Sequence, residues 1–249
     1  LGNYLGAVRK WVELQHLHSC FFCIVDLHAL TSNCFAGSGL RSNAISLFAT
    51  YIACGIDPKH ATVFMQSSVP EHSELCWILH CITPTGWINR MTQFKEKSRS
   101  GLESGMGLYC YPILMASDIL LYKTDLVPVG SDQQQHMELT QDIAKAFNLA
   151  YKVDYFTIPK PVYDTVPRIM SLKDGTKKMS KSDPSVLSCI SLNDEDDIIV
   201  QKIRKATTDS TLGFTLESLE SRPEVHNLIN IFSALAEEKV EAVCNKFKG

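Results

Sequence analysis

The sequence predicts an α/β protein with a doubly wound parallel sheet in residues 1–185 and an all-helical part in residues 186–249. In the first segment, short apolar runs typical of buried parallel strands alternate with stretches of helical periodicity. In the second segment, helical spacing continues with few strand signals. No apolar run approaches the roughly 18 residues that a membrane-spanning helix needs.

The composition is that of an ordinary globular enzyme, large enough to bury a sizeable core. The chain has 249 residues, of which 45% are hydrophobic and 20% charged, and its net charge is −3. This near-neutral balance argues against wholesale coating of nucleic acid, although a local basic patch is compatible with it. The nine cysteines show no disulfide spacing, so we expect reduced thiols in a reducing compartment.

Two early features indicate ligand binding. Residues 4–12 have helical spacing and Asn3 is a good N-cap, so the amides around Gly2 would favour a phosphate. A plain capped helix explains this pattern equally well. Residues 20–26 indicate a central strand, and His28 follows at its carboxyl end, where α/β sheets bind ligands, although a lone histidine there is more often structural than catalytic.

The remaining elements follow from periodicity and turn residues. We expect helices at 40–51, 71–81, 86–94, 109–122, 134–148, 194–206, 223–235 and 236–247, strands at 61–66, 126–129 and 166–172, and a mobile loop at 95–107. His72, Cys76 and His80 share one helical face, a geometry that could bind a metal. No second ligand cluster completes it, so we interpret them as core residues and expect no protein-bound metal.

Asp118 is the most unusual side chain of the 109–122 helix because it lies among apolar neighbours. Burying a carboxylate costs several kcal/mol unless a donor meets it. Asp118 is therefore a candidate functional residue, with a capping or salt-bridge role as the equal alternative. The turn at 130–133 begins the next helix with an amide-rich end suited to an anionic or polyhydroxyl ligand.

The stretch at 178–182, Lys-Met-Ser-Lys-Ser, lies between Gly175 and Pro184 and predicts a loop with solvated lysines. Composition alone supports an exposed basic turn. This string occurs by chance in a chain of this length on the order of once in 10^4 sequences. It resembles the KMSKS loop of class I aminoacyl-tRNA synthetases, whose lysines hold the ATP phosphates and stabilise the departing pyrophosphate.

The resemblance extends over essentially the whole chain. The segments GNYLGA, CIVDLHALT, MTQFKEKS, YPILMASDILLY and VPVGSDQQQHMELT, in this order and at this spacing, are similar to bacterial-type tryptophanyl-tRNA synthetases. The resemblance implies a Rossmann-like catalytic domain, with a helical insertion at about 67–120. It also implies a homodimer, Mg-ATP and L-tryptophan as substrates, and aminoacylation of tRNA(Trp).

The resemblance also assigns site residues, position by position. The implied ATP-binding residues are Gly2, Asn3, Gly130, Ser131, Asp132, Ile169, Lys178, Met179, Ser180, Lys181 and Ser182. The implied tryptophan-binding residues are His28, Tyr111, Met115, Asp118, Ile119, Val127, Val129 and Gln133, with Asp118 accepting the indole N–H. Lys95, Lys178 and Lys181 would act catalytically on the phosphates. Ser131 departs from the glutamate usual in the family, which would weaken a side-chain contact to the ribose.

The family's first strand would precede Leu1, and the end of its anticodon-reading helices would follow Gly249. We therefore expect a core fragment that is poorly soluble or inactive alone. The competing interpretations are a tyrosyl-tRNA synthetase-like enzyme, against which Met115 and the GSDQ turn argue, and a non-catalytic tRNA- or protein-binding fragment. The expected location is the cytoplasm, with the mitochondrial matrix as the alternative.

Overall fold

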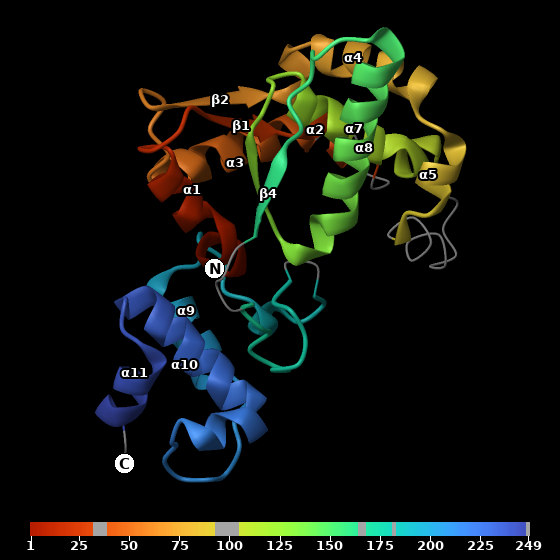
Figure 1. The fold of residues 1–249 in the computed structure, drawn as a ribbon. Helices are drawn as coiled ribbons and strands as arrows, with labels where there is room; N and C mark the ends of the chain where they lie inside the picture. The colour runs from red at the N-terminus through yellow and green to blue at the C-terminus, as the bar shows by residue number, and fades with distance from the viewer. Residues whose placement is uncertain (32–38, 93–104, 164–167, 181–182, 248–249) are drawn as a thin grey trace. The chain divides into compact units, whose positions relative to one another are not determined.

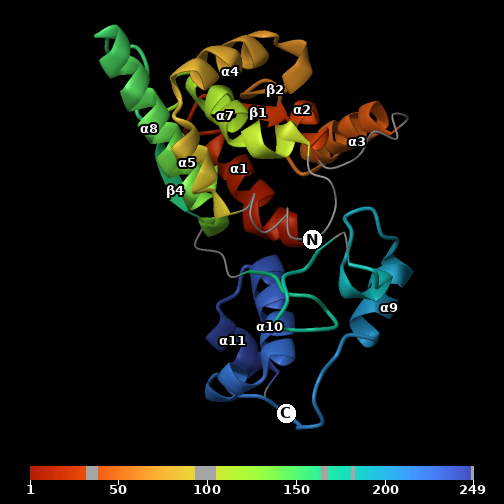
Figure 2. The same cartoon turned by 90° about the vertical axis from the view of Figure 1, so that its right-hand side faces the viewer.

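The computed structural model describes residues 1–31, 39–92, 105–163, 168–180 and 183–247 (Figures 1 and 2). Its contacts divide the chain into two compact units. The lysine-loop unit comprises Leu1–Glu13 and Thr165–Gly249, and the strand unit comprises Leu14–Asp164. The domain boundary predicted at residue 185 stays a prediction. No helix in the described part of the chain is long and apolar enough to cross a membrane.

The strand unit alternates strands and helices along the chain. Its elements are β1 (Cys20–Ile24), α2 (Asp26–Ala29), α3 (Leu40–Ala53), β2 (Ala61–Met65), the 3-10 helix η2 (Gln66–Ser68), α4 (Glu71–Ile82), α5 (Thr85–Asn89), α7 (Met106–Leu120), β3 (Leu126–Val129), the 3-10 helix η3 (Ser131–Gln133), α8 (Gln134–Tyr151) and β4 (Lys160–Tyr163).

The strands of this unit form two parallel pairs. β1 pairs with β2, with Cys20 opposite Ala61, and β3 pairs with β4, with Leu126 opposite Lys160. Parallel neighbours need a crossover, and α3 and α8 lie within the two connections. Two strand–helix–strand units of this kind confirm the predicted α/β class with parallel strands (Figure 1).

Helices α4, α7 and α8 pack together around the main apolar cluster of the strand unit. Ile113, Ala116 and Leu120 recur at helical spacing on α7 and are almost fully buried. Asp118 lies two residues from both Ala116 and Leu120, so it projects from a different side of the helix. The helix therefore presents an apolar side to the core and a carboxylate elsewhere.

One strand was missing from the sequence prediction. β4 was not predicted, because Pro161 lacks an N–H and weakens any strand signal. The strand predicted at 166–172 lies partly outside the described residues. In its described part, only Met170 makes a strand-type bridge, and this bridge is antiparallel to Lys178.

Several helix ends also differ from the prediction. α5 ends at Asn89 rather than at residue 94, and α7 begins at Met106, inside the segment expected to be a loop. In the C-terminal part, α10 (Pro223–Ala236) ends at Glu237, whose φ of 57° is left-handed. The helix predicted at 236–247 therefore cannot start there, and α11 runs over Val240–Lys246.

In the described residues of the lysine-loop unit, the regular elements are helices. Its other elements are the π-helical turn η1 (Tyr4–Val8), which continues into α1 (Arg9–Leu14), the 3-10 helix η4 (Val186–Ser188), α9 (Asp196–Arg204) and the 3-10 helix η5 (Glu217–Ser221). Its largest apolar cluster contains Leu5, Ile169, Leu172, Met179, Ile190 and Ile231. Segments far apart in the sequence therefore share one core around the lysine motif.

The chain doubles back just before the lysine motif. The Met179 N–H donates to the Ile169 carbonyl at 3.0 Å, and the Ser171 N–H donates to the Lys177 carbonyl at 2.7 Å. Asn227 of α10, which is 3% exposed, accepts from the Met170 N–H at 2.8 Å and donates to the Met170 carbonyl at 2.9 Å. One buried amide thus ties this hairpin to α10.

Gly175 lies in the turn of this hairpin, against the start of α10. A Cβ there would lie 2.6 Å from the Glu224 nitrogen and 2.6 Å from the Pro223 carbonyl carbon, and main-chain atoms cannot move aside cheaply. We expect Gly175→Ala to lower the free energy of unfolding by about 1–3 kcal/mol, the usual cost of overpacking. Urea unfolding measures this difference.

The matched control is Gly86→Ala in α5. No atom lies within 4 Å of a Cβ at Gly86, so alanine should stabilise this helix by about 0.5–1 kcal/mol. An unfolding midpoint of Gly175→Ala equal to that of the wild type would show that the turn is not packed against α10.

Candidate active site

The helix that begins at Gly2 packs against the lysine motif. A Cβ at Gly2 would lie 3.6 Å from the Met179 Cβ and 3.9 Å from the Ile169 Cβ. Met179 is 7% exposed and Ile169 is 4% exposed, whereas Lys178 and Ser180 are exposed. This alternation buries Met179 as an anchor and leaves the Lys178 ammonium accessible to a ligand.

The capping role predicted for Asn3 was wrong. Its φ of −67° and ψ of −34° are helical, and its side chain makes no capping hydrogen bond. Helical backbone begins at Gly2, so the Asn3 N–H belongs to the first turn, where amides have no partner within the helix. Lys95, Lys181 and Ser182, also predicted for this site, lie outside the described residues.

The predicted ribose turn lies in the strand unit, between β3 and α8. The Gln133 N–H donates to the Gly130 carbonyl at 2.9 Å, and the Gln133 side chain donates to Asp132 at 2.8 Å. A Cβ at Gly130 would lie 2.6 Å from the Asp132 Oδ1, so glycine leaves room for the carboxylate to fold over the turn. Ser131 and Asp132 are both exposed.

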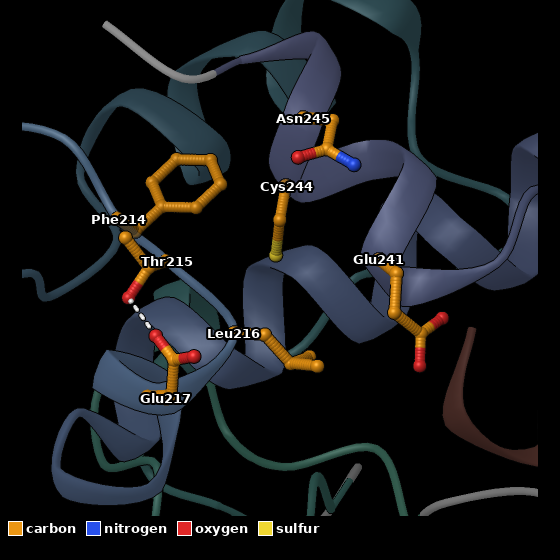
Figure 3. Close-up of a pocket in the computed structure, with 7 residues that line it drawn as sticks. All are labelled: Phe214, Thr215, Leu216, Glu217, Glu241, Cys244 and Asn245. Carbon is orange, nitrogen blue, oxygen red and sulfur yellow. Dashed lines mark hydrogen bonds between the residues drawn. The ribbon is translucent and has the colours of Figure 1, made fainter.

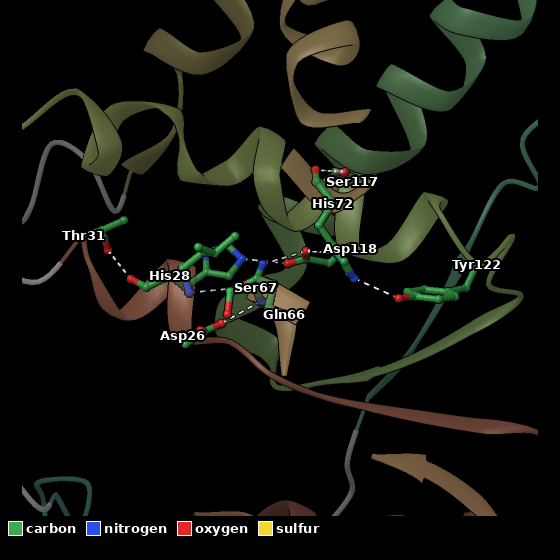
Figure 4. Close-up of polar contacts among 10 residues, drawn as sticks. Asp26, His28, Thr31, Gln66, Ser67, His72, Ser117, Asp118 and Tyr122 are labelled. Carbon is green, nitrogen blue, oxygen red and sulfur yellow. Dashed lines mark hydrogen bonds and ion pairs between the residues drawn. The ribbon is translucent and has the colours of Figure 1, made fainter. Parts of the chain in front are cut away.

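Asp118 of α7 is the centre of the main polar cluster of the strand unit (Figure 4). Its Oδ1 lies 2.6 Å from the His72 Nδ1 and 2.7 Å from the Gln66 Nε2. Its Oδ2 lies 2.7 Å from the His28 Nε2. The three donors come from α2, η2 and α4, so four elements meet at one carboxylate.

The protonation state of Asp118 follows from these bonds. Burial raises the pKa of Asp118, but the hydrogen bonds from the two histidines and Gln66 outweigh burial and hold this pKa below its usual value. At neutral pH the group is therefore a carboxylate, which only accepts hydrogen bonds and has about four acceptor positions. Three of these positions are occupied within the protein, so one remains on Oδ2.

Further bonds fix the donors themselves. The Leu27 N–H donates to the Gln66 Oε1 at 3.2 Å, which leaves the Gln66 amide N–H to face Asp118. The Ser67 N–H donates to Asp26 at 3.0 Å. Both side chains lie at the carboxyl ends of the paired strands, because Gln66 directly follows β2 and Asp26 comes two residues after the end of β1. The end of this strand pair therefore holds the Asp118 cluster in place.

The structure brings three of the residues predicted for tryptophan together. The rings of His28 and Tyr111 meet edge to face with centroids 6.2 Å apart, and His28 bonds Asp118. Met115 and Ile119 follow on α7, and Ile119 is only 8% exposed. Val127 and Val129 lie half-buried on one face of β3, and Gln133 ends the turn that follows.

Sequence reasoning missed three partners of this cluster: Gln66, His72 and Tyr122. The available signals were a polar residue at the end of a buried strand and a histidine on an apolar helix face. The sequence indicates a core position for His72, together with Cys76 and His80, and the His72 side chain is 0% exposed. The His80 ring donates to the Cys76 carbonyl at 2.7 Å rather than converging with His72, and the described residues contain no three-residue metal cluster.

A separate cavity of about 270 Å³ lies in the lysine-loop unit (Figure 3). Its lining comes from the segment around η5 and from α11, and comprises Phe214, Thr215, Leu216, Glu217, Glu241, Cys244 and Asn245. Thr215 donates to Glu217 at 3.2 Å at its edge. None of the predicted site residues lines this cavity, so it is not part of the candidate active site.

Comparison with known proteins gives a consistent result. A tryptophan–tRNA ligase of Rickettsia bellii is 49% identical over 251 residues, covering 100% of this chain and 76% of that protein. The tryptophanyl-tRNA synthetase structure from Mycoplasma pneumoniae has a TM-score of 0.87 at 38% identity, covering 100% of this chain and 76% of that one.

The Campylobacter jejuni tryptophanyl-tRNA synthetase, solved with ADP and tryptophan, has a TM-score of 0.79 at 31% identity, covering 98% of this chain and 81% of that one. Residues 1–248 match the family described as class I tRNA synthetases for tryptophan and tyrosine. With the lysine motif and a parallel α/β fold in place, the chain belongs to the class I aminoacyl-tRNA synthetases of the tryptophan and tyrosine family.

Proposed function

We propose that this protein activates L-tryptophan with ATP and transfers the tryptophanyl group to tRNA(Trp). The observation that carries this proposal is the Asp118 carboxylate, which three donors fix in place while one acceptor position remains on Oδ2. Tryptophan differs from the other large apolar amino acids in carrying an indole N–H donor. The names of the relatives from Rickettsia bellii and Campylobacter jejuni support the same substrate.

The reaction has two displacement steps. In the first, a carboxylate oxygen of tryptophan attacks the α-phosphorus of ATP, and the bond to the bridging oxygen breaks so that pyrophosphate leaves. In the second, a ribose hydroxyl at the tRNA 3′ end attacks the acyl carbon, AMP leaves, and the hydroxyl proton is released. Positioning and charge stabilisation suffice for both steps, with no covalent enzyme intermediate.

We assign the phosphates to the lysine motif. Lys178 is exposed beside the first turn of the helix that begins at Gly2, so an ammonium and free amides lie in the same unit. Lys181 and Lys95 would add charge to the departing pyrophosphate, and Mg2+ would enter with ATP as part of the substrate. The turn of Gly130, Ser131 and Asp132 would hold the ribose, with Ile169 beside the adenine.

We assign the indole to the strand unit. Asp118 would accept its N–H, while His28 bonds the carboxylate and the Tyr111 ring meets the His28 ring edge to face. The remaining residues proposed to line the indole are Met115, Ile119, Val127, Val129 and Gln133. A homodimer, and a location in the cytoplasm or the mitochondrial matrix, are parts of the same proposal and rest on the family resemblance alone.

The direct test is ATP–pyrophosphate exchange with each of the twenty amino acids, run on the full-length gene product. Tryptophan alone should support rapid exchange. Rapid exchange with tyrosine in place of tryptophan would assign the protein to the other branch of the family, and no exchange with any amino acid would contradict an activating enzyme.

For the lysine motif, we expect Lys181→Ala to reduce tryptophan activation by at least about 10²-fold, with a smaller effect on tryptophan binding. The reason is that an ammonium facing developing pyrophosphate charge acts mainly in the transition state. Exchange kinetics measure kcat and KM separately. Lys177→Ala is the control, because the Lys177 ammonium pairs with Asp174 at 3.1 Å. A rise in KM alone, with kcat unchanged, would contradict the proposed role of Lys181.

For Asp118, we expect Asp118→Asn to cost roughly 1.5–3 kcal/mol in kcat/KM for tryptophan, the range for hydrogen bonds to charged groups. Asparagine keeps the size and one acceptor oxygen, but it places an NH2 group among three donors. Discrimination against phenylalanine should fall by a similar margin, because phenylalanine offers no donor to lose. The measurement is kcat/KM for both amino acids.

The control for this change is Asp142→Asn on α8, where the carboxylate is half-exposed and lies 3.7 Å from Lys145. Neither amino acid should be affected by it. If Asp118→Asn slows tryptophan and phenylalanine by the same factor, Asp118 is structural and the indole is recognised elsewhere.

A further inference from the structure

Of the two histidines that contact Asp118, His72 is the more deeply buried. Its side chain is 0% exposed, compared with 15% for His28 and 13% for Asp118. Its Nδ1 lies 2.6 Å from the Asp118 Oδ1, and its Nε2 lies 2.9 Å from the Tyr122 hydroxyl (Figure 4). Both nitrogens of a fully buried ring are therefore engaged, one of them by the carboxylate proposed to recognise the indole.

The chemistry of the neighbours fixes the direction of the bond between His72 and Asp118. Asp118 is a carboxylate and can only accept, so the His72 Nδ1 carries a proton and donates. Burial raises the pKa of Tyr122 to about 12, with smaller effects from Cys23 and Asp118, so its hydroxyl keeps its proton. The His72 Nε2, whose role depends on the tautomer, faces this hydroxyl, which can donate to it. A single chain of donors runs from Tyr122 through His72 to Asp118.

Packing also leaves the His72 ring little freedom. The Ser117 hydroxyl donates to the His72 carbonyl at 2.7 Å, which ties α4 to the residue just before Asp118. The rings of Phe64 and Tyr122 lie 5.7 Å and 5.5 Å from the His72 ring, centroid to centroid. The ring is therefore held from its backbone side and by two neighbouring aromatic rings.

The two oxygens of Asp118 therefore have different environments. Oδ1 receives His72 and Gln66, which uses both of its acceptor positions, and both donors are fully buried. Oδ2 receives only His28, the most exposed of the donors. The carboxylate is thus oriented with Oδ1, whose acceptor positions are both used, toward the core. Oδ2, which has an acceptor position left, faces the more accessible side.

We propose that His72 is a positioning residue for amino-acid specificity. By holding Oδ1 inward, it directs the Oδ2 of Asp118 toward the indole N–H, and Tyr122 holds His72 in the tautomer that this requires. The inference rests on the proposed function, because it concerns how the same carboxylate recognises tryptophan. His72 itself does not contact the substrate.

Two isosteric changes separate the two bonds of the ring. An asparagine amide reaches the place of the His72 Nδ1, so His72→Asn keeps a donor to Asp118. A glutamine amide reaches the place of Nε2, so His72→Gln keeps a partner for Tyr122 and loses that donor. The substrates are tryptophan and its benzothienyl analogue, β-(3-benzothienyl)alanine, which has sulfur in place of the indole N–H and a nearly identical shape.

We expect His72→Gln to lower kcat/KM for tryptophan by about tenfold to a hundredfold in ATP–pyrophosphate exchange, because an oriented hydrogen bond to a charged group is lost. The benzothienyl analogue should change by less than about threefold. His72→Asn should leave both values within about threefold of the wild type. The matched control is His80→Gln on the same helix, whose ring bonds the Cys76 carbonyl and not Asp118.

A loss that is equal for tryptophan and the analogue would overturn the proposal, because a merely structural role affects both substrates. So would a His72→Gln variant with unchanged selectivity. If His72→Gln does not fold, Tyr122→Phe decides the question, since it keeps the ring packing and releases only Nε2. It should lower the tryptophan-to-analogue ratio by about twofold to tenfold, and an unchanged ratio would overturn the proposal.

The outcomes that would overturn the proposed function differ from those that would overturn only the role of His72. A wild-type protein that activates another amino acid but not tryptophan would overturn both proposals at the first control, before any variant is compared. A wild type that prefers tryptophan over the analogue, with variants that do not alter this preference, would overturn only the role of His72.

Discussion

The hydrogen bonding of the Asp118 carboxylate, whose side chain is only 13% exposed, is the interaction on which the strand unit depends. Removing a charge from water costs several kcal/mol unless donors replace the water, and Asp118 receives donors from α2, η2 and α4. These donors lie 90, 52 and 46 residues away in the sequence. The carboxylate therefore joins the end of the β1–β2 pair to α4 and α7. The same bonds that satisfy the charge leave one oxygen incompletely used, which is what the proposed recognition of an indole N–H needs.

The lysine motif depends on a different physical arrangement. Met179 is buried with Ile169 against Gly2, while the flanking Lys178 is exposed, so the motif is anchored by its apolar residue. Asn227 clamps the main chain of the hairpin that leads into it. Phosphate chemistry at this place would use mobile ammonium groups on a fixed backbone, which suits charge that develops only in the transition state.

Much of this could be predicted from the sequence, and the failures have physical causes. β1, β2 and β3 were predicted because each is a short apolar run, whereas Pro161 hid β4. Asp118 was recognised because a carboxylate among apolar neighbours is costly. Its partners Gln66 and His72 were not, because only the folded chain brings them to it, and side-chain pairing between distant elements has no local sequence signal. The capping prediction for Asn3 failed because propensity for a cap does not determine where helical backbone begins.

The most direct measurement is a crystal structure of the full-length protein with bound tryptophan. The central claim is that the Asp118 carboxylate, oriented by its internal donors, recognises the substrate. The indole nitrogen should lie within about 2.7–3.2 Å of the Asp118 Oδ2, with His72 and Gln66 still bonded to Oδ1. An indole nitrogen bonded to another acceptor, with Asp118 unchanged in its internal network, would contradict the claim and leave Asp118 a purely structural group.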